Sequence, residues 1–312
     1  MPFHVSSASA EFGRKEGASM KVKSLKARIG DWIFVLLCVV IALICVIPMI
    51  NLLAKSLSGS EFLVRHEVYL WPKGFNLTAY RYVFEESTGK YVRAFFWTAF
   101  LTLVCTLLSL FMTALCAYPL IFEGLKGKGI INIVITITMF FNAGTIPNYL
   151  LMKQLNFIDN PLVLIVPSCL SIYNMIIMRS FFYGIPESLR ESAQIDGASF
   201  FTILGKIYLP LSKPVFASLA LFYAVGRWNG YSDSLMYMTN KKMFTLQHLL
   251  YNILKAIESV SEIATQEGST PPGLNESMKA AVVMFSTVPI LVVYPFLQKY
   301  FISGVTMGAV KE

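Results

Sequence analysis

The sequence predicts an all-α, polytopic membrane protein. Hydrophobic residues make up 55% of its 312 residues and charged residues 14%, with a mean hydropathy of +0.61, so the chain is too apolar for an ordinary soluble domain. The lengths of its uncharged stretches agree, because a helix needs about 20 apolar residues to cross a bilayer. Five such stretches are Trp32–Ala54, Ala94–Phe122, Ile130–Met152, Pro161–Met178 and Ala280–Gln298.

A sixth span is predicted between Lys213 and Arg227. Only Pro214–Gly226 is uncharged there, so a span requires both cationic side chains to reach the bilayer surface from its ends. We include it because the loops on either side must otherwise lie on the same side of the membrane. Basic residues place the N-terminus in the cytoplasm, and six spans return the C-terminus to that side. These basic residues are Arg14, Lys15, Lys21, Lys23, Lys26 and Arg28, with Lys126 and Lys128 in the second loop.

The residues before the first span are polar. Residues 1–19 lack the apolar core of a signal peptide, and the basic flank of the first span begins directly after Met20, which makes Met20 a candidate start. We expect residues 1–29 to form a cytoplasmic segment. Residues 1–19 are predicted to be dispensable, because they carry no span and no apolar face to bury.

The third span is interrupted at 142–149, where polar side chains, glycine and proline occur together. Irregular backbone at membrane depth persists only where protein or water satisfies it, so this segment is either a packed kink or the lining of a cavity. Trp228 and Asn229 offer an aromatic face and an amide, which suit a sugar, although anchoring at the membrane interface is equally compatible. The uncharged candidates for a translocation path are Asn142, Thr145, Asn148, Tyr149, Tyr173, Asn174, Trp228 and Asn229.

The loop at 184–213 is amphipathic and predicts two short helices. Pro186 suits a helix start, and Gly197 tolerates the left-handed conformation that ends a helix, so a second helix can begin near Ser199. On periodicity alone, a helix lying on lipid and a docking helix are equally compatible. The apolar stripe of the second helix consists of Phe200, Ile203, Leu204 and Ile207.

Several kinds of site are not predicted. The glycine-containing turns at 123–129 and 205–207 lack the spacing of a phosphate-binding P-loop. The net charge of +8 is scattered among loops, without the basic stripe of a nucleic-acid interface. We therefore expect no nucleic-acid partner and no catalytic, metal or cofactor site in this chain. The cysteines lie in apolar spans without disulfide or metal spacing: Cys38, Cys45, Cys105, Cys116 and Cys169.

The 184–213 loop also carries a longer pattern. Glu191-Ser192-Ala193, three residues, Gly197, nine residues and Ile207-x-Leu209-Pro210 resemble the EAA loop of binding-protein-dependent ABC importer permeases, with Ser192 where the family usually has alanine. The resemblance implies coupling helices that dock into a groove on a separate ATPase subunit. The residues it assigns to this contact are Glu191, Ala193, Asp196, Gly197, Ala198, Phe200, Phe201, Ile207, Leu209 and Pro210.

The C-terminal segment, 301–312, has two glycines and few charges, which on physical grounds alone predicts a disordered tail. It resembles the Gly-x-x-x-Gly-x-Val-Lys tail of the maltose-type second permease subunit, which inserts between paired ATPase subunits. The resemblance therefore implies a cytoplasmic tail that contacts ATPases through Gly304, Gly308, Val310 and Lys311.

Taken together, residues 30–300 are expected to form a six-span permease domain of a bacterial carbohydrate importer, in the oligosaccharide branch, multi-pass in the inner membrane. The resemblance implies a homologous second permease subunit, two ATPase subunits that hold ATP and Mg²⁺, an extracytoplasmic solute-binding protein, an oligosaccharide substrate and membrane lipid.

Two alternatives stay open. A secondary transporter would need ionisable residues inside its spans, and the uncharged stretches offer none. A membrane-embedded enzyme would need a catalytic constellation, whereas His4, His66 and His248 lie outside the spans without metal or triad spacing.

Overall fold

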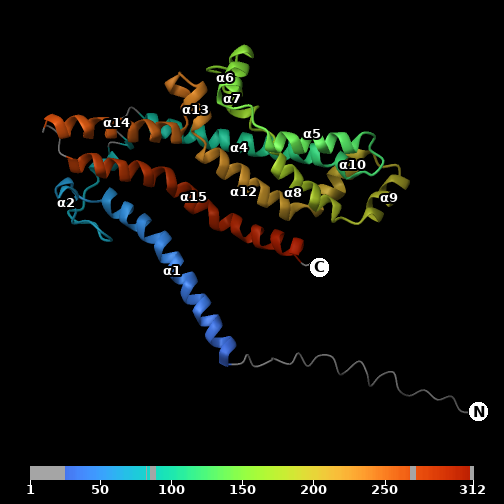
Figure 1. Cartoon of the computed structure of the whole chain (residues 1–312), viewed down its shortest axis with the longest axis horizontal. Helices are drawn as coiled ribbons and strands as arrows, with labels where there is room; N and C mark the ends of the chain where they lie inside the picture. The colour runs from blue at the N-terminus through green and yellow to red at the C-terminus, as the bar shows by residue number, and fades with distance from the viewer. Residues whose placement is uncertain (1–24, 82, 85–88, 268–271, 310–312) are drawn as a thin grey trace, which may run out of the picture. The chain divides into compact units, whose positions relative to one another are not determined.

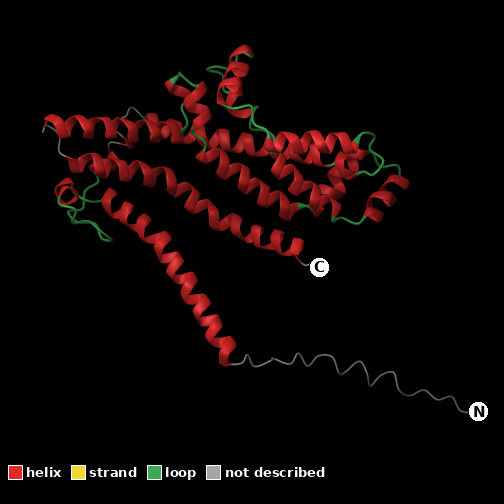
Figure 2. Ribbon diagram, in the orientation of Figure 1, coloured by secondary structure: helices red, strands yellow, loops and turns green. Residues whose placement is uncertain are grey.

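The computed structural model describes residues 25–81, 83–84, 89–267 and 272–309 (Figure 1). Within these ranges every regular element is a helix (Figure 2), which confirms the all-α prediction. The chain forms two compact units, Met1–Ile50 and Asn51–Glu312. The first contains most of α1 (Leu25–Ser56), and the second contains the other helices. The predictions for residues 1–24, including the candidate start at Met20, lie outside the described residues.

Three helices of the described part are long and apolar enough to cross a membrane, and they correspond to the first, second and last predicted spans. Two further pairs of helices pass the same test together, but each pair is sharply bent. The described residues thus supply three spans, or up to five if each bent pair counts as one. None of these segments covers the predicted fourth span, Pro161–Met178, so the total of six stays a prediction. The three single segments are Gly30–Ser56 in α1, Lys90–Ile121 in α4 (Lys90–Ala117) and η2 (Pro119–Ile121), and Glu276–Pro295 in α15 (Pro272–Ala309). The first bent pair is α5 (Lys128–Phe140) with α6 (Thr145–Gln154), at an angle of 112°. The second is Phe200–Leu211 with α12 (Lys213–Asn229), at an angle of 83°.

The predicted break in the third span is confirmed. Helix α5 ends at Phe140 and α6 begins at Thr145, and between them Gly144 has a φ of +91°, a conformation that L side chains rarely adopt. The 112° bend means that Ile130–Met152 does not continue in one direction.

The fourth predicted span, Pro161–Met178, is not one helix. It contains α7 (Leu162–Ile165), a non-helical stretch at 166–171, and the start of α8 (Ile172–Tyr183). Pro167 explains the break, because proline lacks an N–H and disfavours helical backbone at the residue before it. The helix restarts where the Ser171 side chain accepts a hydrogen bond from the backbone N–H of Asn174 at 3.4 Å.

The core of the second unit lies among α4, α8, α12 and α15. Helix α12 packs along α4 and α15, which run beside it (Figure 1), and α8 packs against α4 and α12. The remaining helices are short or peripheral: α2 (Ser60–Val64), α3 (Thr78–Arg81), α9 (Glu187–Ile195), α10 (Phe200–Ile203), the π-helical η3 (Leu204–Tyr208), α11 (Leu209–Leu211), α13 (Ser232–Tyr237), η4 (Lys241–Met243) and α14 (Leu246–Glu267).

The last helix is longer than the sequence predicts. Helix α15 includes the predicted span Ala280–Gln298 and continues to Ala309, so the expectation of a disordered tail is wrong for residues 301–309. Extending an existing helix needs no new nucleation step, which explains why two glycines do not end it. Gly304 and Gly308 therefore lie on a helix. Val310 and Lys311 lie outside the described residues.

The prediction that Arg227 reaches the bilayer surface is wrong. Its side chain is 7% exposed and pairs with Asp233 through two nitrogens, one of them at 3.0 Å. It also donates to the carbonyl oxygen of Leu164 at 3.1 Å. Arg227 thereby joins the end of α12 to α7 and α13. Lys213, at the other end of α12, is exposed as expected.

The Arg227–Asp233 pair predicts a difference between two variants that each replace a cation of α12 by methionine. Arg227→Met leaves Asp233 and the Leu164 carbonyl without their donor, and breaking a buried ion pair costs about 3 kcal/mol. Lys213→Met removes a charge of the same sign from the same helix where it is exposed. We expect a clear drop in Tm in detergent for Arg227→Met and little change for Lys213→Met. Equal Tm values in the two variants would show that the pair adds no stability.

Candidate functional site

The 184–213 loop folds as two helices separated by a glycine. Helix α9 follows Pro186 and ends at Ile195, and Gly197 then has a φ of +78°. The N–H groups of Gly197 and Ala198 donate back to Gln194 and Ala193 at 3.0 and 2.9 Å, which satisfies carbonyls at the helix end. Ser199 caps α10 by accepting from the N–H of Thr202 at 3.3 Å. The predicted start, break and restart are confirmed.

The apolar residues of this loop divide between two faces. Ile203 and Leu204 are buried and Ile207 is half-buried, within a cluster formed with the ends of α4 and α8. Three other apolar side chains face outward instead. The exposed fraction is 86% for Ile195, 59% for Phe200 and 77% for Phe201, which makes these three the most exposed large apolar side chains of the loop.

The cluster that holds the loop is the largest group of buried apolar residues described. Tyr208 packs edge-on against Tyr118 and Phe182, with ring centroids 5.1 and 5.3 Å apart. The contacts of Tyr208 therefore connect the loop to the second span and to α8. The buried members of the cluster are Ala114, Ala117, Tyr118, Leu120, Ile121, Met175, Met178, Phe182, Ile203, Leu204, Tyr208, Val215 and Leu219.

Phe122 contacts both helices of the loop, a role that sequence reasoning missed. Its ring meets Phe200 of α10 edge-on at 5.5 Å. The guanidinium of Arg190 in α9 lies 5.0 Å from the Phe122 ring centroid and pairs with Glu187 one turn earlier. The i, i+3 spacing of Glu187 and Arg190 indicates their ion pair, but no local signal indicates the contacts of Phe122.

The other residues that the resemblance assigns to the loop lie on it without gathering at one point. Ala193 and Ala198 are half-buried against the cluster, and so is Leu209. The exposed members are Glu191, Asp196 and Pro210.

The candidate path residues do not meet in one cavity. At the break between α5 and α6, Asn142, Thr145 and Asn148 are exposed. The Asn142 side chain accepts from the N–H of Gly144 at 2.9 Å. Tyr149 stacks on Tyr237 of α13, with ring centroids 6.0 Å apart and planes 8° apart.

The candidates on α8 and α12 differ in exposure. Tyr173 is exposed and Asn174 is buried. Trp228 is 7% exposed, donates through Nε1 to the carbonyl of Ser286 at 3.1 Å, and meets Phe95 edge-on at 5.6 Å. Its ring is thus held among α4, α12 and α15, an arrangement that favours packing over stacking on a sugar or anchoring at the interface. Its neighbour Asn229 is exposed.

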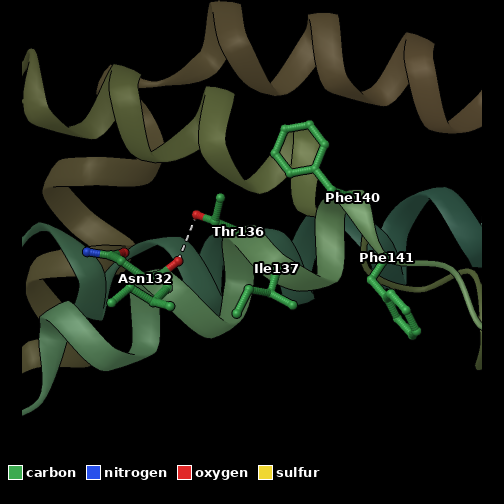
Figure 3. Close-up of a pocket in the computed structure, with 6 residues that line it drawn as sticks. Asn132, Thr136, Ile137, Phe140 and Phe141 are labelled. Atoms are coloured by element: carbon green, nitrogen blue, oxygen red, sulfur yellow. Dashed lines mark hydrogen bonds between the residues drawn. The ribbon is translucent and has the colours of Figure 1, made fainter.

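One face of α5 borders a pocket of about 530 Å³ (Figure 3). Thr136 donates to the backbone carbonyl of Asn132 at 2.8 Å. The Asn132 side chain accepts from Nη1 of Arg179 on α8 at 2.7 Å. Sequence reasoning missed this face because it counted the stretch only as uncharged. The pocket is lined by Asn132, Ile133, Thr136, Ile137, Phe140 and Phe141.

A buried serine–histidine contact lies outside the apolar spans. Oγ of Ser234 is 2.9 Å from Nδ1 of His248, and burial lowers the pKa of His248 against the opposing effect of the Asp233 carboxylate. Asp233 is bound to Arg227 rather than to the histidine, and both Ser234 and His248 are buried. The arrangement lacks the exposed nucleophile of a hydrolase. In the part of the chain that the structure describes, no group of three or more His, Cys, Asp or Glu could hold a metal ion.

Comparison with known proteins agrees with the membrane architecture. Residues 96–259 match the family model "Binding-protein-dependent transport system inner membrane component". The chain is 37% identical over 287 residues to the polygalacturonan/rhamnogalacturonan transport system permease protein YtcP of Bacillus subtilis (strain 168), covering 92% of this chain and 100% of YtcP. It is 28% identical over 294 residues to the arabinooligosaccharides transport system permease protein AraQ of Halalkalibacterium halodurans, covering 93% and 100%.

A solved structure is also similar. It is the crystal structure of a bacterial ABC transporter involved in the import of the acidic polysaccharide alginate, and one of its chains matches with a TM-score of 0.80 and 30% identity, covering 89% of this chain and 99% of that chain. Family model, relatives and structure all point to the same class of protein. The chain therefore belongs to the family of binding-protein-dependent transport system inner membrane components, the permeases of ABC importers.

Proposed function

We propose that this chain is a permease subunit through which a bacterial ABC importer moves an acidic oligosaccharide across the inner membrane. The observation that carries the proposal is similarity over nearly the whole chain to a polygalacturonan/rhamnogalacturonan permease and to a chain of an alginate importer. Polygalacturonan and alginate are both polymers of uronic acids. Their fragments therefore present a carboxylate on every uronate residue.

The proposed assembly contains a homologous second permease subunit, two ATPase subunits that bind ATP and Mg²⁺, and an extracytoplasmic solute-binding protein. This chain contributes six spans with both termini in the cytoplasm. The turns at 123–129 and 205–207 lack the P-loop spacing, so hydrolysis belongs to the partner subunits. The end of α15, with Gly304 and Gly308, and the following Val310 and Lys311 are proposed to contact the ATPases.

The 184–213 loop is proposed as the coupling element. Ile195, Phe200 and Phe201 form an exposed apolar surface that suits a groove on the ATPase. The opposite face, with Ile203 and Leu204, is buried against α4 and α8. A movement imposed on the outer face would therefore be transmitted to the bundle as a rigid-body change, which is how domain closure commonly drives switching.

The exposed polar residues beside the α5–α6 break are proposed to line the translocation path. Asn142, Thr145 and Asn148 are exposed there, and an unpaired amide or hydroxyl at membrane depth is costly unless it is wetted. Four further residues remain predicted to lie near the same path: Tyr149, Tyr173, Asn174 and Asn229.

The function is tested by uptake in vesicles that contain the complete assembly. Trigalacturonate should accumulate only when this chain, the second permease, the ATPases, the solute-binding protein and ATP are all present. The purified chain alone should not hydrolyse ATP, because the motif that cradles phosphate is missing. Uptake without ATPase subunits, or hydrolysis by the chain that survives mock-purification controls, would refute the assignment.

Gly197→Val should uncouple the assembly. No atom lies within 4 Å of where a Cβ would sit, so the penalty comes from the backbone at φ +78°, about 1–2 kcal/mol. Relief of that strain would re-aim α10. Gly197→Asn is the matched control, because asparagine tolerates the left-handed conformation. We expect the valine variant to insert normally but to lose sugar-stimulated ATP hydrolysis, while the asparagine variant keeps most of it. Equal hydrolysis in both variants would show that the turn does not aim a coupling helix.

Phe201→Asp should prevent ATPase docking without unfolding the loop. Phe201 is 77% exposed, so the free chain tolerates the carboxylate, whereas a docked groove would bury it unpaired. Phe201→Tyr preserves the ring and is the control. In a pull-down of the ATPase by the permease pair, we expect retention to fall at least about tenfold for the aspartate variant, a loss of about 1.4 kcal/mol, and to change little for the tyrosine variant. Normal retention of the aspartate variant would place the docking surface elsewhere.

A further inference from the structure

Arg179 is a half-buried cation without a carboxylate partner in the described part of the chain. Its side chain donates from Nη1 to Oδ1 of Asn132, a neutral amide, at 2.7 Å. Other cations among the described residues do pair with carboxylates, including Lys55, Lys73, Arg190 and Arg227. A guanidinium among apolar helices is costly unless it meets an anion or water.

The remaining donors of Arg179 are open to a ligand. The nitrogen atoms that are both buried and unpaired in the described residues belong to Arg190 and Arg227, not to Arg179. Asn132 holds one arm of the guanidinium by accepting a hydrogen bond and leaves its positive charge uncompensated. A planar guanidinium fixed in this way is suited to a carboxylate, which it can bind through two parallel hydrogen bonds.

The Asn132–Arg179 pair lies at the end of the bundle that carries the 184–213 loop. Arg179 precedes Pro186 by seven residues, about two helical turns. Asn132 is in the second turn of α5, which begins at Lys128. In the proposed importer this end faces the cytoplasm, so an anion bound here would be leaving the membrane.

The α5 face leads from this pair toward the opposite end of the bundle. Asn132, Thr136 and Phe140 recur every four residues and so form one stripe of the helix, and all three border the pocket of about 530 Å³ (Figure 3). The Phe140 ring is 82% exposed. An amide, a hydroxyl and an aromatic face are the groups that bind sugars, through hydrogen bonds to hydroxyls and stacking on C–H faces. Directly beyond Phe141 comes Asn142, at the α5–α6 break.

We propose that the Asn132–Thr136–Phe140 face of α5 is the cytoplasmic half of the translocation path, and that Arg179 binds the carboxylates of the acidic sugar as it leaves. The proposal rests on the proposed function and assigns to Arg179 the selection of charged over neutral sugars at the exit. Binding is transient, because a carboxylate held too tightly would block release.

The test uses the complete assembly reconstituted in vesicles, with trigalacturonate as the probe. Arg179→Gln removes the charge but retains an amide donor for Asn132, and Arg179→Lys retains the charge. Lys153→Gln is the matched control, since it removes one exposed positive charge from α6. We expect Arg179→Gln to slow uptake about tenfold or more, the scale of a lost hydrogen bond between charged groups. Arg179→Lys should recover part of the rate, and Lys153→Gln should match the wild type.

A second readout measures binding rather than transport. Saturation-transfer NMR of trigalacturonate with the detergent-solubilised assembly, without the solute-binding protein, should give a signal that weakens in Arg179→Gln. Fully methyl-esterified trigalacturonate, which has no carboxylate, should give a signal that the substitution leaves unchanged. Assembly of the permeases with the ATPases should be unaltered in all variants. Equal weakening for acid and ester would reduce Arg179 to a packing residue and overturn the proposal.

The lipid composition of the vesicles and the charge of the sugar provide two controls. If the uptake defect of Arg179→Gln disappears in vesicles of phosphatidylcholine alone and returns with phosphatidylglycerol, the anion at Arg179 is the headgroup of an anionic lipid, and the proposal is wrong. If the wild-type assembly imports trigalacturonate and Arg179→Gln imports it equally well, this inference fails while the proposed function stands. If the wild-type assembly imports only neutral sugars, the proposed substrate class fails first and the role of Arg179 fails with it.

Discussion

The structure depends on one packing contact, the burial of the second loop helix against the ends of α4 and α8. Tyr208 packs edge-on against Tyr118 and Phe182, and Ile203 is buried in the same cluster. Burying a large apolar side chain contributes about 1.5–3 kcal/mol, and close-packed interiors transmit displacement rather than absorb it. The loop therefore acts as part of the bundle, although α9 on its outer side carries no buried residue. In the proposed coupling, this asymmetry would let a partner docked on the exposed face of the loop move the membrane domain.

Buried polar groups divide this protein into fixed and adaptable parts. Thr98 of α4 donates to the carbonyl of Ala94 and accepts from the N–H of Leu246, at 2.7 and 2.8 Å. Together with the Arg227–Asp233 pair, it fixes the end of the bundle opposite the loop, because satisfied buried groups are expensive to separate. Arg179 differs, since its neutral partner leaves its charge uncompensated. In the proposed exit path, that incomplete satisfaction would let Arg179 bind a charged sugar and release it.

The sequence predicted well wherever local chemistry decides the backbone. The helix break at Gly197 and the interruption at 142–149 follow from conformations that few residues adopt. Prediction from the sequence failed where tertiary packing decides the position of a side chain. Nothing local indicates that Arg227 turns toward Asp233 and the Leu164 carbonyl instead of the bilayer surface. The fourth span was also predicted wrongly, because the uncharged stretch was taken for one helix and the break at Pro167 was not considered. The pairing of Asn132 with Arg179, 47 residues apart, has no signal in a single sequence.

Helix α5 is left largely uncovered by the rest of the described chain. None of its described side chains is buried, although its residues are strongly apolar, and within the bundle it packs mainly on α8. Lipid could cover Ile133 and Ile137, since hydrocarbon is as apolar as they are. Lipid hydrocarbon offers no hydrogen bonds to Asn132 or to the guanidinium of Arg179, which need water or a polar partner. We therefore propose that the polar stripe of α5 faces an aqueous space enclosed by a second permease subunit, so that the path forms between two subunits rather than inside one.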